Sequence, residues 1–217
     1  MISFIPEKLN KSKLDILCLG AHCDDIEIGC GATLLKWIRQ ARINNIVWVV
    51  FSSEERRKEE AILSANRYLE TLINKEIIVL DYRDAFLHFS GREVKEEFER
   101  LKSKIDPDIV FTHYRDDRHQ DHRLLSDLAW NTFRDHLILE YEIPKYDGDL
   151  GVPNTFVSVD REEVNGKILG LLQCFTSQLG KHWFDEETFR SLMRIRGLEC
   201  NSPTRYAESF YLRKCLL

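Results

Sequence analysis

The sequence has no excess of basic residues, no long apolar run and no Cys-x-x-Cys pair. Its 217 residues include 31 Lys and Arg against 36 Asp and Glu, a formal net charge of −5. Nucleic acid is therefore not expected as a partner. Without a run of about eighteen apolar residues, no transmembrane segment is expected. Residues 1–8 also lack the charged and long apolar regions of a secretory signal peptide.

Other absences narrow the class of protein further. Six cysteines could form three disulfides, but without a Cys-x-x-Cys pair or a signal peptide a reduced, cytoplasmic protein is expected. Gly29 and Gly31 follow an apolar run, but Ala32 and Thr33 come next, so the third glycine of a dinucleotide-binding loop is missing. A nucleotide-binding Rossmann domain is therefore disfavoured. No repeat, low-complexity tract or linker is present, and we expect one domain over residues 1–217.

Short apolar runs alternate with amphipathic stretches along the first half of the chain. Strands are expected at residues 16–20, 46–51, 77–80 and 109–112, with helices between them. This order predicts an α/β fold, a Rossmann-like three-layer sandwich with a mostly parallel central sheet. The C-terminal third predicts further strands at 138–143, 155–159 and 206–212, and helices at 162–172 and 188–196.

Polar residues gather where the expected strands end. They fall at residues 22–25, 52–57, 81–84 and 113–122. In open parallel sheets, ligands bind beyond the carboxyl ends of the strands. The four loops are therefore expected to open on one edge of the sheet and to form one site.

The first of these loops has the sequence His22-Cys23-Asp24-Asp25, and a helix is expected to start at the glycines after it. A His-x-x-Asp turn can place an imidazole nitrogen and a carboxylate oxygen about 2.0–2.2 Å from one zinc ion. His22 and Asp25 fit that role, with Asp24 beside the metal as a proton acceptor. The alternative is a solvated turn with an Asp that caps the helix.

The second loop supplies a third candidate ligand. Residues 119–122 read HQDH, and His122 is expected in the first turn of a helix. Two His and one carboxylate leave one zinc position open for water, which is the catalytic pattern. His119 is expected to face the same cavity, and Asp121 to hold an imidazole by its N–H. The alternative is an N-capped surface helix.

The chain resembles a known family through these two motifs. Residues 21–31, AHCDDIEIGCG, are similar to the Ala-His-Pro-Asp-Asp signature of the LmbE-like, or PIG-L, zinc-dependent N-deacetylases, with Cys23 in place of Pro. Residues 119–122 are similar to their second motif, His-Pro-Asp-His. The resemblance implies removal of an N-acyl group from an amino sugar. It also implies His22, Asp25 and His122 as zinc ligands, Asp24 as general base, His119 as the group that stabilises the oxyanion or protonates the amine, and Asp121 as a carboxylate that orients a histidine.

Further segments extend the resemblance over most of the chain. They are Ser53-Glu54, residues 153–157, Lys167, Ser177-Gln178 and residues 206–210.

Substrate contacts are expected from the polar strand ends. Glu54, Arg56, Arg57 and Arg83 are candidates to contact sugar hydroxyls or a phosphate, with surface salt bridges as the alternative. The expected substrate is a small-molecule, lipid-linked or nucleotide-linked amino sugar, and a homo-oligomer is possible.

Two rival functions stay open at this point. A non-haem iron oxygenase also uses two His and one carboxylate, so Fe²⁺ is a possible alternative to Zn²⁺. A catalytically inactive sugar-binding protein is the second rival.

Overall fold

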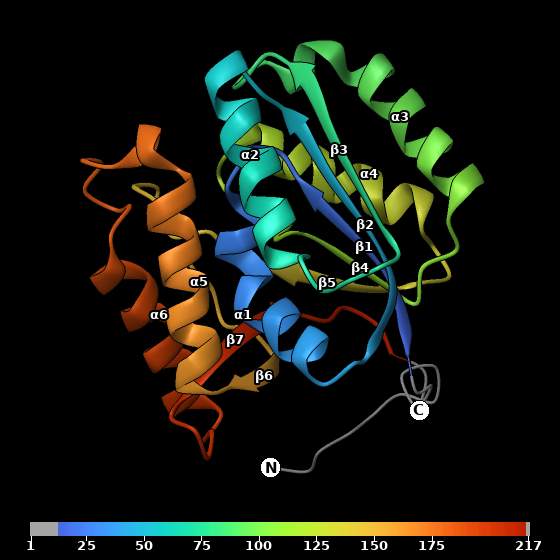
Figure 1. Ribbon diagram of the computed structural model, residues 1–217. Helices are drawn as coiled ribbons and strands as arrows, with labels where there is room; N and C mark the ends of the chain where they lie inside the picture. The colour runs from blue at the N-terminus through green and yellow to red at the C-terminus, as the bar shows by residue number, and fades with distance from the viewer. Residues whose placement is uncertain (1–12, 216–217) are drawn as a thin grey trace.

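A computed structural model describes residues 13–215 of the chain (Figure 1). The segment 1–8, used above to judge a signal peptide, lies outside these residues. Over residues 13–215, seven strands form one sheet in the order β3-β2-β1-β4-β5-β7-β6. The strands are β1 (Leu14–Gly20), β2 (Ile43–Ser52), β3 (Lys75–Tyr82), β4 (Ile109–His113), β5 (Leu137–Tyr141), β6 (Thr155–Val159) and β7 (Tyr206–Tyr211).

The sheet is parallel over its first five strands. β1 pairs in parallel with β2 and β4, so that Cys18 lies opposite Trp48 on one side and Phe111 on the other. β7 pairs antiparallel with β5 and β6, and β6 is the edge strand at that end of the sheet. The expectation of a mostly parallel sheet is confirmed. All seven expected strands are present, β6 with the expected bounds and the other six with shifted ends.

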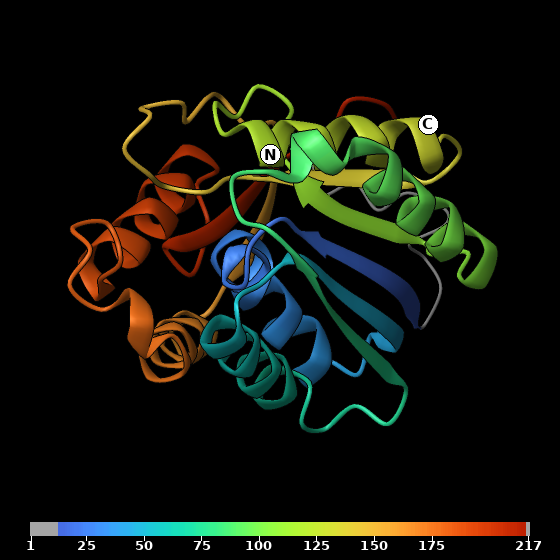
Figure 2. The same ribbon diagram turned by 90° about the horizontal axis from the view of Figure 1, so that it is seen from above.

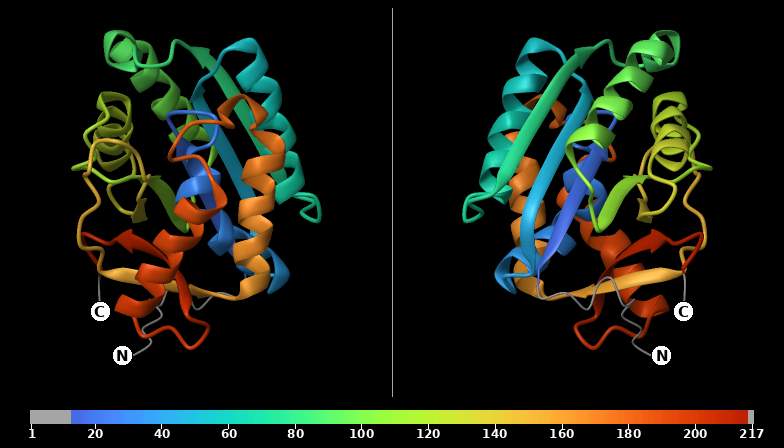
Figure 3. Two further views of the ribbon diagram at one scale, coloured as in Figure 1. Left: turned by 90° about the vertical axis from the view of Figure 1, so that its left-hand side faces the viewer. Right: turned by 90° about the vertical axis from the view of Figure 1, so that its right-hand side faces the viewer.

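Six α-helices among the described residues cover the sheet. They are α1 (Asp25–Arg39), α2 (Glu55–Tyr68), α3 (Gly91–Lys104), α4 (Gln120–Thr132), α5 (Arg161–Cys174) and α6 (Glu186–Glu199), with short 3₁₀ turns η2 (Leu87–Ser90) and η3 (Thr176–Gln178). Figure 2 shows α3 and α4 on one side of the sheet and α1, α2 and α5 on the other. In Figure 3, α6 lies with β6 and β7 at one end of the sheet. None of the helices in residues 13–215 has the length and apolar character needed to cross a membrane.

Two apolar cores form because successive side chains of a strand point to opposite faces. Ile16 and Cys18 of β1 pack into the core beneath α1 and α5, whereas Leu17 and Leu19 pack into the core beneath α3 and α4. All four side chains are fully buried. A central parallel strand covered on both faces needs such a continuous apolar run, which explains why β1 was recognisable from sequence.

The chain order places the two His/Asp loops side by side. After β1 the chain continues outward through β2 and β3 and then returns to β4 on the other side of β1. This reversal of strand order is the point where open α/β sheets bind ligands. The loops that follow β1 and β4, residues 21–24 and 114–119, meet there.

Helix α1 begins earlier than expected. It starts at Asp25 rather than at the glycines. Gly29 instead lies inside the helix, where a Cβ atom would stand 2.2 Å from the ring of Tyr141. The glycine therefore permits close helix–sheet packing and does not mark the helix start.

Candidate active site

Three potential ligand atoms converge at the carboxyl edge of the sheet. His22 Nδ1 lies 3.0 Å from His122 Nε2 and 3.3 Å from Asp25 Oδ2, and His122 Nε2 lies 3.6 Å from Asp25 Oδ2. Ligands placed tetrahedrally around zinc at about 2.0–2.2 Å are themselves roughly 3.3–3.6 Å apart. The two distances to Asp25 fall in this range and the distance between the two imidazoles is somewhat shorter, so the three atoms predicted from sequence as ligands are close enough together to share one ion.

Local structure holds each of these groups in place. His22 stands in the turn after β1, and its backbone N–H donates to Asp25 Oδ2 at 2.6 Å. Asp25 is the first residue of α1 and His122 lies in the first turn of α4, and both side chains are buried. The site is thus assembled from two helix starts and one turn, all close to β1.

Asp117 fixes the orientation of His122. Its Oδ2 lies 2.9 Å from His122 Nδ1, so His122 donates there and keeps the Nε2 lone pair for the site. Burial lowers the pKa of His122 to about 3, which keeps the ring neutral. Burial opposes ionisation of Asp117, but the hydrogen bond from His122 and the charge of Lys145 outweigh it and hold its pKa well below the usual range. Lys145 Nζ lies 2.9 Å from Asp117 Oδ2.

The second nitrogen of His22 faces two carboxylates. Nε2 lies 3.0 Å from Asp84 Oδ1 and 3.5 Å from Asp121 Oδ2. Asp121 is fully buried, and its two oxygens accept no hydrogen bond from the described residues. Asp121 is therefore placed to hold His22, the kind of contact that fixes which nitrogen of a ligating imidazole carries the proton.

His113 is a site residue that the sequence analysis did not single out. It is fully buried at the end of β4, and its ring stacks on His122 with centroids 3.9 Å apart. His113 Nε2 lies 3.3 Å from Asp25 Oδ2 but accepts the backbone N–H of Ala21 at 2.9 Å. Because that lone pair is already used, His113 supports the loop after β1 rather than serving as a fourth ligand.

His119 has its proton position set by the helix it precedes. It occupies the N-cap of α4, and its Nδ1 accepts the backbone N–H of Asp121 at 3.3 Å. In a neutral imidazole with Nδ1 as acceptor, Nε2 carries the proton. Burial and the nearby charge of His22 lower the pKa of His119, which favours that neutral form. His119 lines the cleft and can offer an N–H donor to a bound group.

Asp24 is a buried carboxylate next to the three ligand atoms. Arg57 Nη2 donates to its Oδ1 at 2.9 Å, while Oδ2 is buried without a hydrogen-bond partner among the described residues. Burial raises the pKa of Asp24, and the charge of Arg57 opposes that rise. A carboxylate with one anchored and one unused oxygen is suited to accept a proton.

The four candidate substrate contacts separate in the structure. Glu54 and Arg57 line the cleft, whereas Arg56 and Arg83 do not. Arg56 is exposed and donates to Thr176 Oγ1 at 3.3 Å. The Arg83 guanidinium lies 3.7 Å from the centre of the Phe86 ring.

The site opens into a cleft of about 460 Å³, within the usual range for small-molecule sites. Its walls come from the turns after β1, β2, β3 and β4, the loop after β5 and residues 178–183. Lys145, Tyr146, Lys181 and Trp183 line this cleft together with the His/Asp cluster.

Cys23, which stands where the family signature has Pro, is an unreactive thiol. Its side chain is buried and its thiol donates to the Ser52 carbonyl at 3.5 Å. Burial raises the pKa of the thiol to about 12. Since the thiolate is the metal ligand and nucleophile, Cys23 does not compete with the His/Asp set.

The donor set fits a divalent transition metal. Two imidazole nitrogens and one carboxylate oxygen suit zinc with a position open for water, and they suit Fe²⁺ as well. The fully buried Asp121 has two oxygens without a hydrogen-bond partner among the described residues, and one of them lies near His22 Nε2. A carboxylate in that position is expected beside an imidazole that binds a metal, because it holds the ring in place. His22, Asp25 and His122 are therefore the residues that would hold the ion.

Sequence comparison identifies relatives. Residues 17–133 match the family model described as PIG-L: GlcNAc-PI de-N-acetylase. The chain is 31% identical over 171 residues to the uncharacterized deacetylase YaiS of Escherichia coli (strain K12), covering 75% of this chain and 90% of that protein.

Solved structures share the fold. The N,N'-diacetylchitobiose deacetylase of Pyrococcus horikoshii superposes with a TM-score of 0.72 at 23% identity, over 96% of this chain and 87% of that one. The conserved protein TT1542 of Thermus thermophilus gives 0.73 at 21% identity, over 94% and 96%. GalB of Pseudomonas putida KT2440, a 4-carboxy-2-hydroxymuconate hydratase, gives 0.70 at 16% identity, over 94% and 97%. Because a hydratase has the same fold, the fold alone does not specify the reaction.

Proposed function

The chain belongs to the PIG-L family of de-N-acetylases, as its two motifs predicted, and from this premise we propose that it is a zinc-dependent hydrolase that removes an N-acetyl group from an amino-sugar derivative. The observation that carries this proposal is the convergence of His22, Asp25 and His122 beside the buried Asp24. When bound there, zinc supplies a Lewis acid that activates water and polarises an amide carbonyl.

The side chains of this site have distinct roles in the hydrolysis. Asp24 accepts a proton from the attacking water through its unused Oδ2, while Arg57 holds Oδ1. His119 donates its Nε2–H to the oxygen that becomes negative as water adds to the carbonyl. The C–N bond then breaks as the proton held by Asp24 passes to the leaving nitrogen, so that the amide and water become a carboxylic acid and an amine, which ionise to a carboxylate and an ammonium. Asp117 and Asp121 keep the two ligand imidazoles in the required orientation.

We propose an N-acetylated amino sugar as substrate, either free or linked to a lipid or a nucleotide. The family description and the Pyrococcus relative both name N-acetylated amino sugars. In the cleft, Glu54 offers a carboxylate for sugar hydroxyls, and Tyr146 and Trp183 offer aromatic surface. Arg56 and Arg83 lie outside the cleft and can contact only those parts of a substrate that extend beyond it. A single catalytic domain over residues 1–217 and a cytoplasmic location remain proposals from the sequence.

The test is amine release from a panel of N-acetylated sugars by zinc-loaded protein, with Asp24→Asn measured beside it. Loss of a general base usually costs about 10²–10⁴ in rate, so Asp24→Asn is expected to lower kcat by that factor while zinc stays bound. Asp116→Asn is the control, because this carboxylate is exposed and lies outside the cleft.

Each outcome tests a different part of the proposal. Amine release that Asp24→Asn abolishes without loss of zinc supports hydrolysis with Asp24 as base. Stoichiometric zinc binding with no amine released from any sugar would count against the substrate class. Oxygen consumption by the iron-loaded protein would favour the oxygenase instead, and a protein that binds neither metal would contradict the metal site itself.

A further inference from the structure

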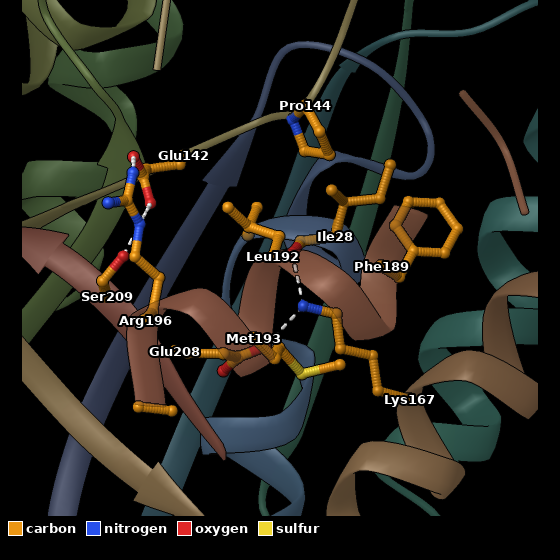
Figure 4. Close-up of a pocket in the computed structure, with 12 residues that line it drawn as sticks. Ile28, Glu142, Pro144, Lys167, Phe189, Leu192, Met193, Arg196, Glu208 and Ser209 are labelled. Carbon is orange, nitrogen blue, oxygen red and sulfur yellow. Dashed lines mark hydrogen bonds and ion pairs between the residues drawn. The ribbon is translucent and has the colours of Figure 1, made fainter. Parts of the chain in front are cut away.

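A buried ion pair binds the backbone in the middle of helix α1. Lys167 of α5 and Glu208 of β7 lie 2.6 Å apart (Nζ to Oε1), and both side chains are almost fully buried. Figure 4 shows the Lys167 ammonium between Glu208 and the backbone of Ile28. Neither residue lines the cleft that holds the His/Asp cluster.

The pair binds backbone groups of α1 rather than side chains. Lys167 Nζ donates to the Ile28 carbonyl at 2.5 Å. Glu208 accepts the N–H of Ala32 at 3.0 Å and that of Thr33 at 2.6 Å. In a regular α-helix the N–H of residue 32 is directed at the carbonyl of residue 28. The ion pair therefore gives a hydrogen-bond partner to each of the two backbone groups that face each other across one step of the helical ladder.

This step is directly connected to the catalytic turn. The N–H of Ile28 donates to the carbonyl of Asp24 at 3.0 Å, and Asp25 starts the helix. Ile28 is thus held on both sides, by Asp24 through its N–H and by Lys167 through its carbonyl. One residue of backbone therefore links Asp24 to the ion pair formed by α5 and β7.

Stability alone does not account for such a pair. Replacing a buried ion pair by apolar groups of similar volume is often neutral or stabilising, because both charges must be removed from water. A charged pair that binds the backbone of one helical turn is explained if that turn has to be held in a fixed position.

We propose that Lys167 and Glu208 are positioning residues that fix the first turn of α1, so that Asp24 and Asp25 keep their places opposite His122. They touch no reacting atom and act through the Ile28 backbone. The catalytic consequence rests on the proposed function, whereas the positional effect on α1 does not.

The test uses two variants that keep the buried charges balanced. Lys167→Met/Glu208→Gln removes both charges together, and Glu208→Asp keeps the charge but draws the carboxylate back from α1. Lys36→Met is the matched control, because Lys36 holds the other end of the same helix through the Ser158 carbonyl. Amide hydrogen exchange is measured on metal-free protein, zinc affinity by competition with a chelator, and unfolding by denaturant.

The double variant is expected to unfold at a denaturant concentration close to that of wild type. Its amides in residues 25–33 are expected to exchange at least about tenfold faster, reporting local opening. Zinc affinity is expected to fall about 10–100-fold, the usual effect of losing support for a metal ligand. Lys36→Met is expected to leave zinc affinity and exchange in residues 25–33 unchanged.

Wild-type exchange and wild-type zinc affinity in the folded double variant would overturn the proposal. If that variant does not fold, the same two measurements on Glu208→Asp decide the question by the same criteria. Failure of the wild-type protein to bind zinc would count against the proposed function, while exchange in the metal-free proteins would still decide the role of the pair.

Discussion

His22 Nδ1 lies 3.0 Å from His122 Nε2, although the two residues are 100 positions apart in the chain. Two imidazole lone pairs repel each other at that distance unless a cation or a proton lies between them. Burial opposes charge on His22, but Asp25, Asp121 and Asp84 raise its pKa well above the ordinary value. In the metal-free protein His22 therefore carries the proton and donates it to the neutral His122.

Zinc binding is expected to release this proton. Because a metal ligand must be deprotonated, zinc and the His22 proton compete for one position. The pKa of His22 is raised, so the proton is present at neutral pH and zinc affinity is expected to rise with pH. Calorimetric titrations in buffers of different ionisation enthalpy should show about one proton released per zinc near pH 7. If zinc binding released no proton, the assignment of a proton to His22 in the metal-free protein would be contradicted.

Asp117→Asn is expected to weaken zinc binding about 10–100-fold, because Asp117 holds His122 by Nδ1. The asparagine also removes a charge from the group formed with Lys145. Asp116→Asn, one residue away and exposed, is the control and is expected to bind zinc as wild type does. Chelator competition measures both variants, and equal affinities would exclude a role for Asp117 in orienting His122.

Arg57→Met is expected to lower kcat more than it raises KM. Sequence analysis assigned Arg57 to substrate binding, but its guanidinium contacts Asp24 at 2.9 Å and comes within 3.4 Å of Ser177 Oγ. Losing that anchor leaves the proposed base free to turn away from the water. Arg56→Met is the comparison, because Arg56 is exposed and outside the cleft. A rise in KM alone for Arg57→Met would favour the substrate-binding assignment.

Cys23→Ala is expected to leave zinc affinity unchanged within about twofold. The buried thiol, with a pKa of about 12, is protonated at neutral pH and is occupied by the Ser52 carbonyl. Stability should fall by about 1 kcal/mol, from the buried sulfur and its weak hydrogen bond. Spectra of the cobalt-substituted protein provide the check, because a cysteine ligand would add a sulfur-to-metal charge-transfer band.

Much of the fold could be predicted from the residues. The apolar runs of β1 and β2 and the amphipathic helices between them specified a parallel sheet covered on both faces, as observed. The resemblance to the PIG-L family is confirmed by the family match and the YaiS relative. Element ends were less accurate. Helix α1 starts at Asp25 because the chain turns directly after β1, whereas Gly29 packs closely against Tyr141 and Gly31 against Tyr68.

The site was predictable only where its residues lie close together in sequence. His22 and Asp25 share one turn, and His119, Asp121 and His122 share one helix start, so short motifs revealed them. His113 ends β4 and Asp117 lies in the loop before that helix, with no spacing that marks them, yet they contact Asp25 and His122.

The sequence by itself determined the sheet, its two covered faces and the residue types available for metal chemistry, because strand and helix periodicity and short motifs are local properties. Only the tertiary structure decided which carboxylate holds which imidazole, that Arg57 anchors Asp24, and that Lys167 and Glu208 enter α1. Those contacts join residues far apart in the chain. They depend on strand register and helix packing, which place side chains to within a few tenths of an ångström and leave no local pattern in the residues themselves.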